Sequence, residues 1–506
     1  MPINYIPNDP LAVGNLPMRA GILPRPNRAA GRAGFDFVNA AMEQAASVGT
    51  PDFLFWQCRQ AVLLTVELWE ELDGVLKTWS PRVTNPAKLP VTFDVEAGLN
   101  AFYHPQLGLR FFHNTTGTKT TFSGASTDVV AHECGHALLD SVRPQLFDIH
   151  QTEFAAFHES FGDCVAILVA LADDDCRKAL LTLTPDLSKP NFVEAVMEDL
   201  SDGVRRQLGA THPAALPRRA MNNFQFQLPT ALPSSAPPAK MSGEAHAFSR
   251  IFTGCFYDLI RGLFTASAAK DEQALRAAAF TAGKLLIAAA KQASVTSRFF
   301  QAVGRAMVLA DDTSNGGANR AVIGQAFAGH GILLGSSAAL MPTVSLPGAP
   351  PSVEGRARTA VVDPLTTAEL KRRLNAKPSA KLAFEAVSMG GQKVVRAVHQ
   401  RTVALDDLGS ALQGVVAVVP ESALLGNSGG SAAVLGALPM ADTTQDEVLG
   451  YVRTLLDSGR IAVGKGRSRN VLSAVATDVP SDSTATATHT IVAEGGKRVL
   501  HRLQFA

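Results

Sequence analysis

The amino-acid sequence predicts an α+β protein with more than one domain, and three observations lead to this prediction. The chain has 506 residues, which is more than one hydrophobic core commonly holds. Residues 90–122 contain short β-type runs separated by Gly, Pro and Asn, whereas residues 152–336 show mostly helical periodicity. Residues 357–506 alternate hairpin-like and helix-like patterns, which indicates a separate α+β domain.

Shifts in composition divide the chain into five parts. Residues 1–34 are rich in Pro and Gly, so we expect an extended or disordered arm. Residues 35–126 are expected to form a mixed N-terminal half of the main domain, with helices first and then a short β-sheet with an edge strand. Residues 127–335 are expected to form its mainly α-helical half. Residues 336–356 have the composition of a linker, and residues 357–506 are the accessory domain.

Individual elements follow from local signals. A helix is expected over residues 50–79, because Thr-Pro-Asp is a helix start and apolar residues then recur at helical spacing. The runs LPVTFDV, LNAFYHP and LGLRFFHN are expected to be strands of the short sheet. Gly-Gly pairs stand between β-type runs at 390–391 and 495–496, which is typical of hairpin turns. The run TTQDEVLGYVRTLLDSG is expected to be a helix that stops at its glycine.

Composition and charge argue against several classes of function. Hydrophobic residues make up 46% of the chain and charged residues 18%, as in ordinary globular proteins. The formal net charge of +1 provides no general attraction to nucleic acid or to a membrane, so neither is expected as a partner. No signal-peptide pattern opens the chain, and its five cysteines are irregularly spaced. We therefore expect a cytoplasmic protein, or one exported without a cleavable signal peptide.

The stretch TDVVAHECGHALLD, residues 127–140, carries the strongest chemical signal. His132 and His136 are four residues apart, so a helix places both imidazoles on one face, within reach of one metal ion. Glu133 points to the side of that face, where a base can take a proton from a water molecule at the metal. A catalytic zinc site has three protein ligands and one open position, so a third ligand is expected downstream.

The next helical segment, residues 152–172, offers that ligand. Glu159 and Asp163 are four residues apart on one face, and a strongly apolar run follows them. Glu159 can complete a His-His-Glu site, and Asp163 can accept the remaining ring N–H of a ligand histidine. Two carboxylates on an apolar helix face need a compensating group, and a metal ion is one.

Together these segments resemble the zinc site of the thermolysin-like metalloendopeptidases, the gluzincins. GASTDVVAHECGHALLD is similar to that family's zinc-binding helix, and Glu159-Ser-Phe-Gly-Asp163 matches its glutamate-ligand helix. The resemblance spans about residues 90–334. It implies a thermolysin-like catalytic domain, with a mixed N-terminal and a mainly α-helical C-terminal subdomain. It also implies one catalytic Zn²⁺, held by the two histidines and Glu159, and Glu133 as general base in peptide-bond hydrolysis.

Three weaker matches extend the resemblance. LNAFYHP is similar to the edge strand that binds the substrate backbone, which assigns substrate binding to Asn100 and Ala101. RRAMNNF resembles the segment whose arginine holds a substrate carbonyl; Arg219 matches best, and Arg218 is the weaker candidate. GEAHAFSRIFTGCFYDLI is similar to the helix with the second catalytic histidine, which makes His246 a donor to the oxyanion.

The chain also departs from the family pattern. The family has a tyrosine between the second histidine and the glutamate ligand, and this chain has none there, so the donor that replaces it stays open. The acidic residue expected five positions before His246 is Met241, and Glu244 is the nearer carboxylate to orient the imidazole. A structural Ca²⁺ site is implied but incomplete, because Asp128 is in place whereas Ala170 stands where a carboxylate is expected.

These observations predict a zinc-dependent endopeptidase that acts on a peptide or protein substrate. Two alternatives stay open: a zinc hydrolase of a non-peptide amide, and a catalytically weak zinc scaffold that acts through its C-terminal domain. For residues 357–506 we expect binding of a protein partner or occlusion of the groove. The intact Glu133 favours an enzyme, because a purely structural zinc site has no use for a base.

Overall fold

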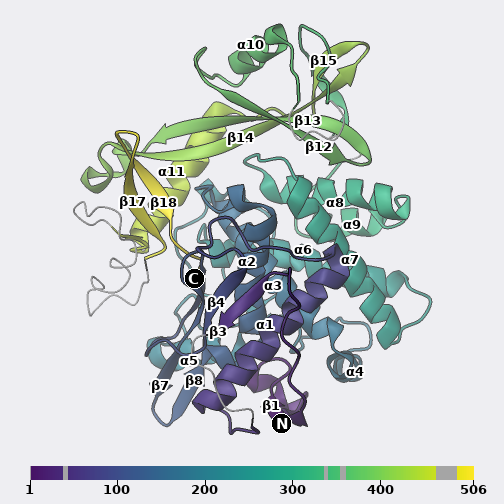
Figure 1. Cartoon of the computed structure of the whole chain (residues 1–506), viewed down its shortest axis with the longest axis vertical. Helices are drawn as coiled ribbons and strands as arrows, with labels where there is room; N and C mark the ends of the chain where they lie inside the picture. Colours follow the sequence, from purple (N-terminus) through teal and green to yellow (C-terminus); the bar gives the residue numbers. More distant parts are fainter. Residues whose placement is uncertain (1, 38–43, 336–339, 354–359, 463–486, 506) are drawn as a thin grey trace.

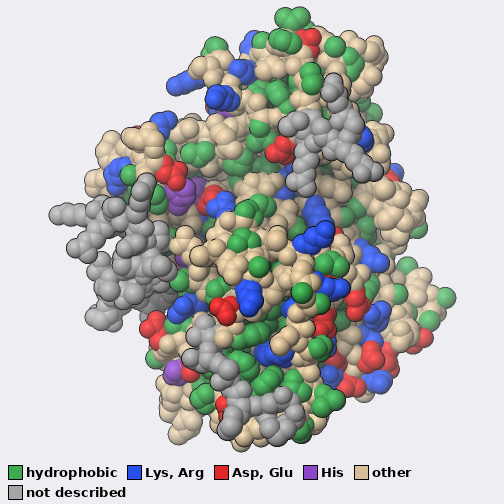
Figure 2. Space-filling model, in the orientation of Figure 1, with side chains coloured by type: hydrophobic (Ala, Val, Ile, Leu, Met, Phe, Trp, Pro, Cys, Tyr) green, Lys and Arg blue, Asp and Glu red, His purple; other side chains and the backbone are tan. Residues whose placement is uncertain are grey.

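The computed structural model describes residues 2–37, 44–335, 340–353, 360–462 and 487–505. It is a mixed α+β structure with several small sheets, so the α+β class predicted from the sequence is confirmed at this level. Figure 1 shows a lower body of helices and small sheets and, above it, a long twisted sheet from the C-terminal part of the chain. Basic and acidic side chains are interspersed over the lower body in Figure 2, in keeping with the small net charge.

A four-stranded sheet in the lower body has the order β3-β4-β6-β5. Its strands are β3 (Gly34–Phe37), β4 (Lys88–Thr92), β5 (Ala101–His104) and β6 (Gly108–Phe111). The strands β3, β4 and β6 are parallel, and β5 is antiparallel to β6 at the edge. Gly108 permits the turn before β6, because its φ is 77° and a Cβ there would lie 1.9 Å from the carbonyl oxygen of Pro90.

Helices fill most of the remaining lower body (Figure 1). In chain order they are α1 (Pro51–Asp73), α2 (Thr127–Val142), α3 (Thr152–Ala172), α4 (Asp174–Leu183), α5 (Glu198–Leu208), α6 (Ala245–Ala266), α7 (Glu272–Gln292), α8 (Phe299–Asn315) and α9 (Arg320–Ala328). The helix expected over residues 50–79 ends early, because Gly74 has a φ of 88° and does not continue it.

Three two-stranded sheets border this body. They are β1 (Ile3–Tyr5) with β2 (Arg19–Ile22), β7 (His113–Thr116) with β8 (Lys119–Phe122), and β9 (Ala195–Val196) with β10 (Arg218–Arg219). Residues 1–34, expected as an extended or disordered arm, therefore include a paired hairpin. The arm also lies on the body, since Asp9 accepts a hydrogen bond of 2.9 Å from the hydroxyl of Ser126, next to the start of α2.

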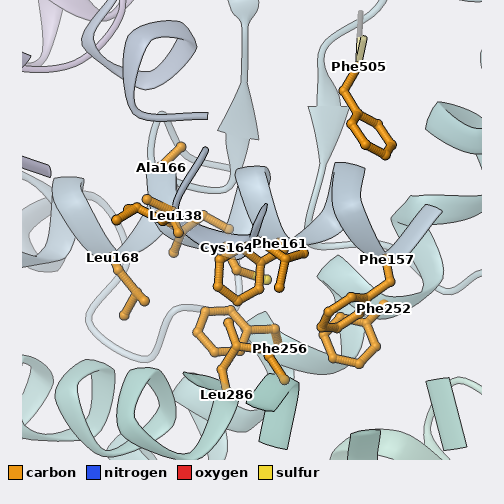
Figure 3. Close-up of a cluster of buried hydrophobic side chains, with 14 of the residues drawn as sticks. Leu138, Phe157, Phe161, Cys164, Ala166, Leu168, Phe252, Phe256, Leu286 and Phe505 are labelled. Carbon is orange, nitrogen blue, oxygen red and sulfur yellow. The ribbon is translucent and has the colours of Figure 1, made fainter. Parts of the chain in front are cut away.

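The helix α3 runs through the centre of the core. Nearly all of its side chains are buried, and it packs against both α2 and α6. Figure 3 shows Phe157 of α3 beside Phe252 of α6, and their ring centroids lie 5.1 Å apart in an edge-to-face arrangement. By length and composition α3 could cross a membrane, yet its apolar stretch is buried inside the protein, as in a central core helix.

An eight-stranded sheet forms the upper part of the structure. Its strands are β11 (Pro342–Ser345), β12 (Leu382–Met389), β13 (Gln392–Ala404), β14 (Val415–Ser428), β15 (Ser431–Leu435), β16 (Ile461–Ala462), β17 (His489–Glu494) and β18 (Lys497–Arg502). Both predicted Gly-Gly hairpins are confirmed, and the glycines of each turn have positive φ. Within the expected linker 336–356, β11 pairs with β15 and belongs to the sheet.

The upper sheet shares part of its core with the helical body. Two helices accompany it, α10 (Pro364–Arg373) and α11 (Ala441–Asp457). Val448 of α11 and Leu500 of β18 belong to the same buried cluster as the side chains of α2 and α3. Arg298 also bridges the two parts, at 3.0 Å from Glu153 of α3 and 2.9 Å from Glu447 of α11. The sheet is thereby placed over the helices that carry the histidines.

The helices α2 and α3 approach each other at two glycines. A Cβ at Gly162 would lie 2.6 Å from Nδ1 of His132, and a Cβ at Gly135 would lie 2.9 Å from the Cα of Gly162. These distances are shorter than van der Waals contact, so no side chain fits at either position. The glycines therefore allow the short distance between the two helices.

We expect Gly162→Ala to lower the free energy of unfolding by about 1–3 kcal/mol, because the added methyl group must displace the His132 ring or separate the helices. The matched control is Gly324→Ala in α9, where an added Cβ meets nothing within 4 Å. That change should raise the free energy of unfolding by up to about 1 kcal/mol, since alanine favours helices. Urea denaturation of both variants measures the difference, and equal effects would contradict the close packing.

Candidate metal centre

The three residues predicted as metal ligands come together between α2 and α3. Nε2 of His132 lies 3.4 Å from one carboxylate oxygen of Glu159, and Nε2 of His136 lies 3.8 Å from the other. All three ligand atoms lie within 4.8 Å of one another. Ligands at about 2.0–2.1 Å from a tetrahedral ion are about 3.4 Å apart. These residues can therefore hold a metal ion.

A hydrogen bond orients the first histidine. Nδ1 of His132 lies 2.9 Å from a carboxylate oxygen of Asp163, one turn after Glu159 on α3. With Nδ1 held by this carboxylate, Nε2 faces Glu159 and is the nitrogen whose lone pair would bind a metal. Nδ1 of His136 differs, since it has no hydrogen-bond partner among the described residues.

The site is buried and rich in carboxylates. His132, His136 and Glu159 are each at most 2% exposed, and Asp163 is fully buried. Buried carboxylates are costly unless cations neutralise them. Imidazole nitrogens and a carboxylate oxygen are together suited to a transition-metal ion. The donor chemistry and the burial therefore both fit a bound cation.

Glu133 directly follows the ligand His132 in α2, and within the described part of the chain no hydrogen bond or ion pair joins it to the three ligands. It is 3% exposed, and its Oε2 has no hydrogen-bond partner among the described residues. Burial raises the pKa of Glu133 to about 8, and the neighbouring Glu159 carboxylate acts in the same direction. A buried carboxylate that has one oxygen without a hydrogen-bond partner and a pKa near neutrality can exchange protons with a bound water or substrate.

The arginine at the site is Arg218, the weaker of the two candidates predicted from the sequence. Its guanidinium lies 2.7 Å from Asp163 and 3.2 Å from Nδ1 of His132. Arg219, the preferred candidate, instead forms an ion pair with Glu194. The two arginines form the short strand β10, and successive side chains of a strand point to opposite faces, so only one of the pair reaches α3.

His246 approaches the site from the start of α6. Its Nε2 lies 3.2 Å from Glu159, and its Nδ1 lies 2.7 Å from Glu244, so Glu244 is the carboxylate that orients the ring. Burial opposes the charged ring, but Glu159 and Glu244 outweigh it and raise the pKa of His246 to about 10. Glu244 also caps α6 by accepting a hydrogen bond from the backbone N–H of Ala247, which holds the histidine at the helix start.

The predicted substrate-binding residues Asn100 and Ala101 lie at the start of the edge strand β5. Ala101 is its first residue and pairs with Phe111 of β6. Tyr103, two residues further along, donates a hydrogen bond of 2.8 Å from its hydroxyl to Asp140 of α2. The edge strand is thus joined to the helix that carries the two histidines.

Sequence reasoning missed several side chains that the fold brings to the site. They are His158, Tyr451, Arg502 and Phe505. His158 stacks on His136 with ring centroids 5.8 Å apart, and Tyr451, Arg502 and Phe505 line a cavity together with Glu159 and His246. No spacing signal links the last three to the metal ligands, because they follow them by hundreds of residues.

The carboxylate expected for a calcium site has other contacts. The carboxylate of Asp128 accepts hydrogen bonds from the backbone N–H groups of Val129, at 2.6 Å, and Met197, at 2.9 Å. Among the described residues, His132, His136 and Glu159 are the group of three ligands whose atoms converge, and Asp128 is outside it. Calcium binding stays a prediction.

No protein-family profile matches the chain, and no curated protein matches it.

We expect His136→Phe to abolish metal binding, because it removes one of three ligands. The matched control is His158→Phe, which changes a neighbouring buried histidine whose two ring nitrogens have no hydrogen-bond partner among the described residues. This control should keep about one metal ion per chain. Elemental analysis after dialysis against zinc measures both variants, and equal metal contents would contradict the ligand assignment.

Proposed function

We propose that the protein is a zinc-dependent endopeptidase of the thermolysin-like, or gluzincin, type. The observation that carries the proposal is that His132, His136 and Glu159 converge while Glu133, next to His132 in α2, interacts electrostatically with them and has one carboxylate oxygen without a partner among the described residues. In this proposal the four-stranded sheet belongs to the N-terminal subdomain and the helices α2 to α9 to the C-terminal subdomain. The edge strand β5 and the helix α2 then form the two sides of the active site.

The zinc ion, when bound, would lower the pKa of a water molecule and polarise the carbonyl group of the peptide bond. Glu133 takes a proton from the attacking water and delivers it to the leaving amine. Burial raises the pKa of Glu133, which favours the form that delivers the proton, whereas the charge of a bound cation would favour the carboxylate that accepts it. Asp163 keeps the ring of His132 in the orientation that the metal site needs.

Charge that develops on the carbonyl oxygen needs donors. Glu244 faces Nδ1 of His246 at 2.7 Å and orients the ring, so the Nε2–H is the group that can donate a hydrogen bond to that oxygen once Glu159 holds the metal. Arg218 is the second candidate donor, since its guanidinium lies within the site and is fixed by Asp163. The thermolysin-like family has a tyrosine between the second histidine and the glutamate ligand, and this chain has none there. In this proposal His246 and Arg218 stabilise the oxyanion in its place.

The edge strand favours a peptide over a small amide as the substrate. The strand β5 pairs with β6 on one side. On its other side the backbone N–H and C=O of Tyr103 form hydrogen bonds with the backbone of Phe505, so this side can pair with an extended chain. An extended peptide binds such an edge as an added strand. A hydrolase of small amides has no need of this surface.

We expect Glu133→Gln to leave zinc binding intact and to reduce peptide hydrolysis by about 10²–10⁴-fold, because glutamine cannot accept the proton. The matched control is Glu71→Gln, which changes an exposed glutamate on α1 paired with Arg276 and should leave the rate unchanged. Zinc is measured by elemental analysis, and cleavage of an unfolded protein by mass spectrometry. Cleavage that survives Glu133→Gln, or failure of the native chain to bind zinc, would contradict the proposed function.

A further inference from the structure

The edge strand β5 is already paired with another part of the same chain. The backbone N–H of Tyr103 donates to the carbonyl of Phe505, and the N–H of Phe505 donates to the carbonyl of Tyr103, both at 3.2 Å. This reciprocal pair is the antiparallel arrangement by which an extended peptide adds to a sheet edge. Residues 503–505 therefore lie where the proposed function requires the substrate backbone.

The side chain of Phe505 fills an aromatic pocket above the metal ligands. Its ring stacks on His158, with centroids 4.0 Å apart and an interplanar angle of 14°, and on His136, at 4.9 Å and 18°. Phe147 meets it edge to face at 5.3 Å, and the guanidinium of Arg502 lies 4.2 Å from its centroid. The pocket thus offers stacking, edge and cation–π contacts, which suit an aromatic side chain.

This placement closes the site. Glu133 is 3% exposed although its proposed role requires contact with a substrate. The cavity beside Glu159 and His246, bounded by Tyr451, Arg502 and Phe505, has a volume of about 30 Å³. That is room for about one water molecule and not for a peptide.

Hydrogen bonds to three neighbouring stretches of the described chain hold the segment in place. The N–H of Leu503 donates to the carbonyl of Thr488 at 2.8 Å, and Arg502 donates to the carbonyl of Phe147 at 2.9 Å. The side-chain amide of Gln504 also donates to the carbonyl of Ala487 at 3.2 Å, and the Tyr103 pair and the stacked ring of Phe505 add to these contacts. Such a short attachment can be displaced by a ligand that makes the same contacts.

We propose that residues 503–505 are an intramolecular peptide ligand that keeps the protein latent. They occupy the edge strand as an added strand, place Phe505 in the aromatic pocket, and are displaced by an extended peptide that carries an aromatic side chain. The inhibitory consequence rests on the proposed endopeptidase function, whereas the occupancy of β5 does not. The two statements can therefore be tested separately.

Hydrogen exchange of the full-length protein tests the occupancy. We expect Phe505→Ala to accelerate exchange in the peptide fragment that contains residues 100–104, because the amide of Tyr103 loses its partner more often. Leu365→Ala, at an exposed site on α10, is the matched control and should leave exchange there unchanged. Phe505→Leu keeps an apolar side chain without the ring, so it provides the test if the alanine variant does not fold.

Peptide hydrolysis tests the inhibition. We expect Phe505→Ala to raise kcat/KM by about 10- to 1,000-fold, because an uncovered conformer is commonly populated at only about 0.1–10% in a latent protein. The synthetic peptide VLHRLQF, the sequence of residues 499–505, should inhibit this variant and restore the slow exchange of β5. The peptide VLHRLQA lacks the aromatic ring and should do neither.

The outcomes separate the two proposals. If Phe505→Ala and Phe505→Leu keep native stability and exchange at β5 is unchanged in both, the intramolecular ligand is overturned. The proposed function is tested separately by Glu133→Gln. Faster exchange with hydrolysis no greater than that of the native chain overturns the latency. Faster exchange with hydrolysis that appears in Phe505→Ala and disappears in Phe505→Ala/Glu133→Gln supports both proposals.

Discussion

The structure depends on one close contact, the approach of α2 to α3 at Gly135 and Gly162. A larger residue at either position would separate the helices by a side-chain thickness. The contact places two histidines of one helix against Glu159 and Asp163 of the other, in a buried part of the core. Two fixed helices hold ligands more accurately than loops do, because each side chain is limited to a few rotamers by its packed neighbours.

This packing buries several carboxylates, and their negative charge must be neutralised by neighbouring positive groups. Glu133, Glu159 and Asp163 are all buried, and isolated buried carboxylates would favour their neutral forms. Arg218 and His246 compensate part of the charge. Burial alone would raise the pKa of Glu159, but the neighbouring imidazoles outweigh it and lower that pKa. A divalent cation would complete the balance, whereas Glu133 stays outside the ion pairs and keeps a pKa close to neutral. The same burial thus favours both a metal ion and a base.

The segment that follows the last strand of the C-terminal sheet contacts the candidate metal centre directly. An unpaired sheet edge is a site for uncontrolled pairing with other chains, so proteins usually cover it. Here the backbone of Phe505 covers β5, and the same residue packs its ring on the histidine stack. Protection of the edge and closure of the site are therefore achieved by one segment. In the proposed enzyme, access to the site depends on the balance between this segment and a competing peptide.

The sequence by itself determined the parts of this protein that follow from local spacing. Residues four apart on a helix share a face, so the sequence could place His132 with His136 on one helix face and Glu159 with Asp163 on another, whereas the structure brings the two faces together. The Gly-Gly turns could also be assigned, because positive φ favours glycine. Only the tertiary structure decided which of two adjacent arginines enters the site and that Phe505 covers it. Those outcomes depend on how separate elements pack against each other. Contacts between residues hundreds of positions apart produce no spacing pattern that the sequence alone could show.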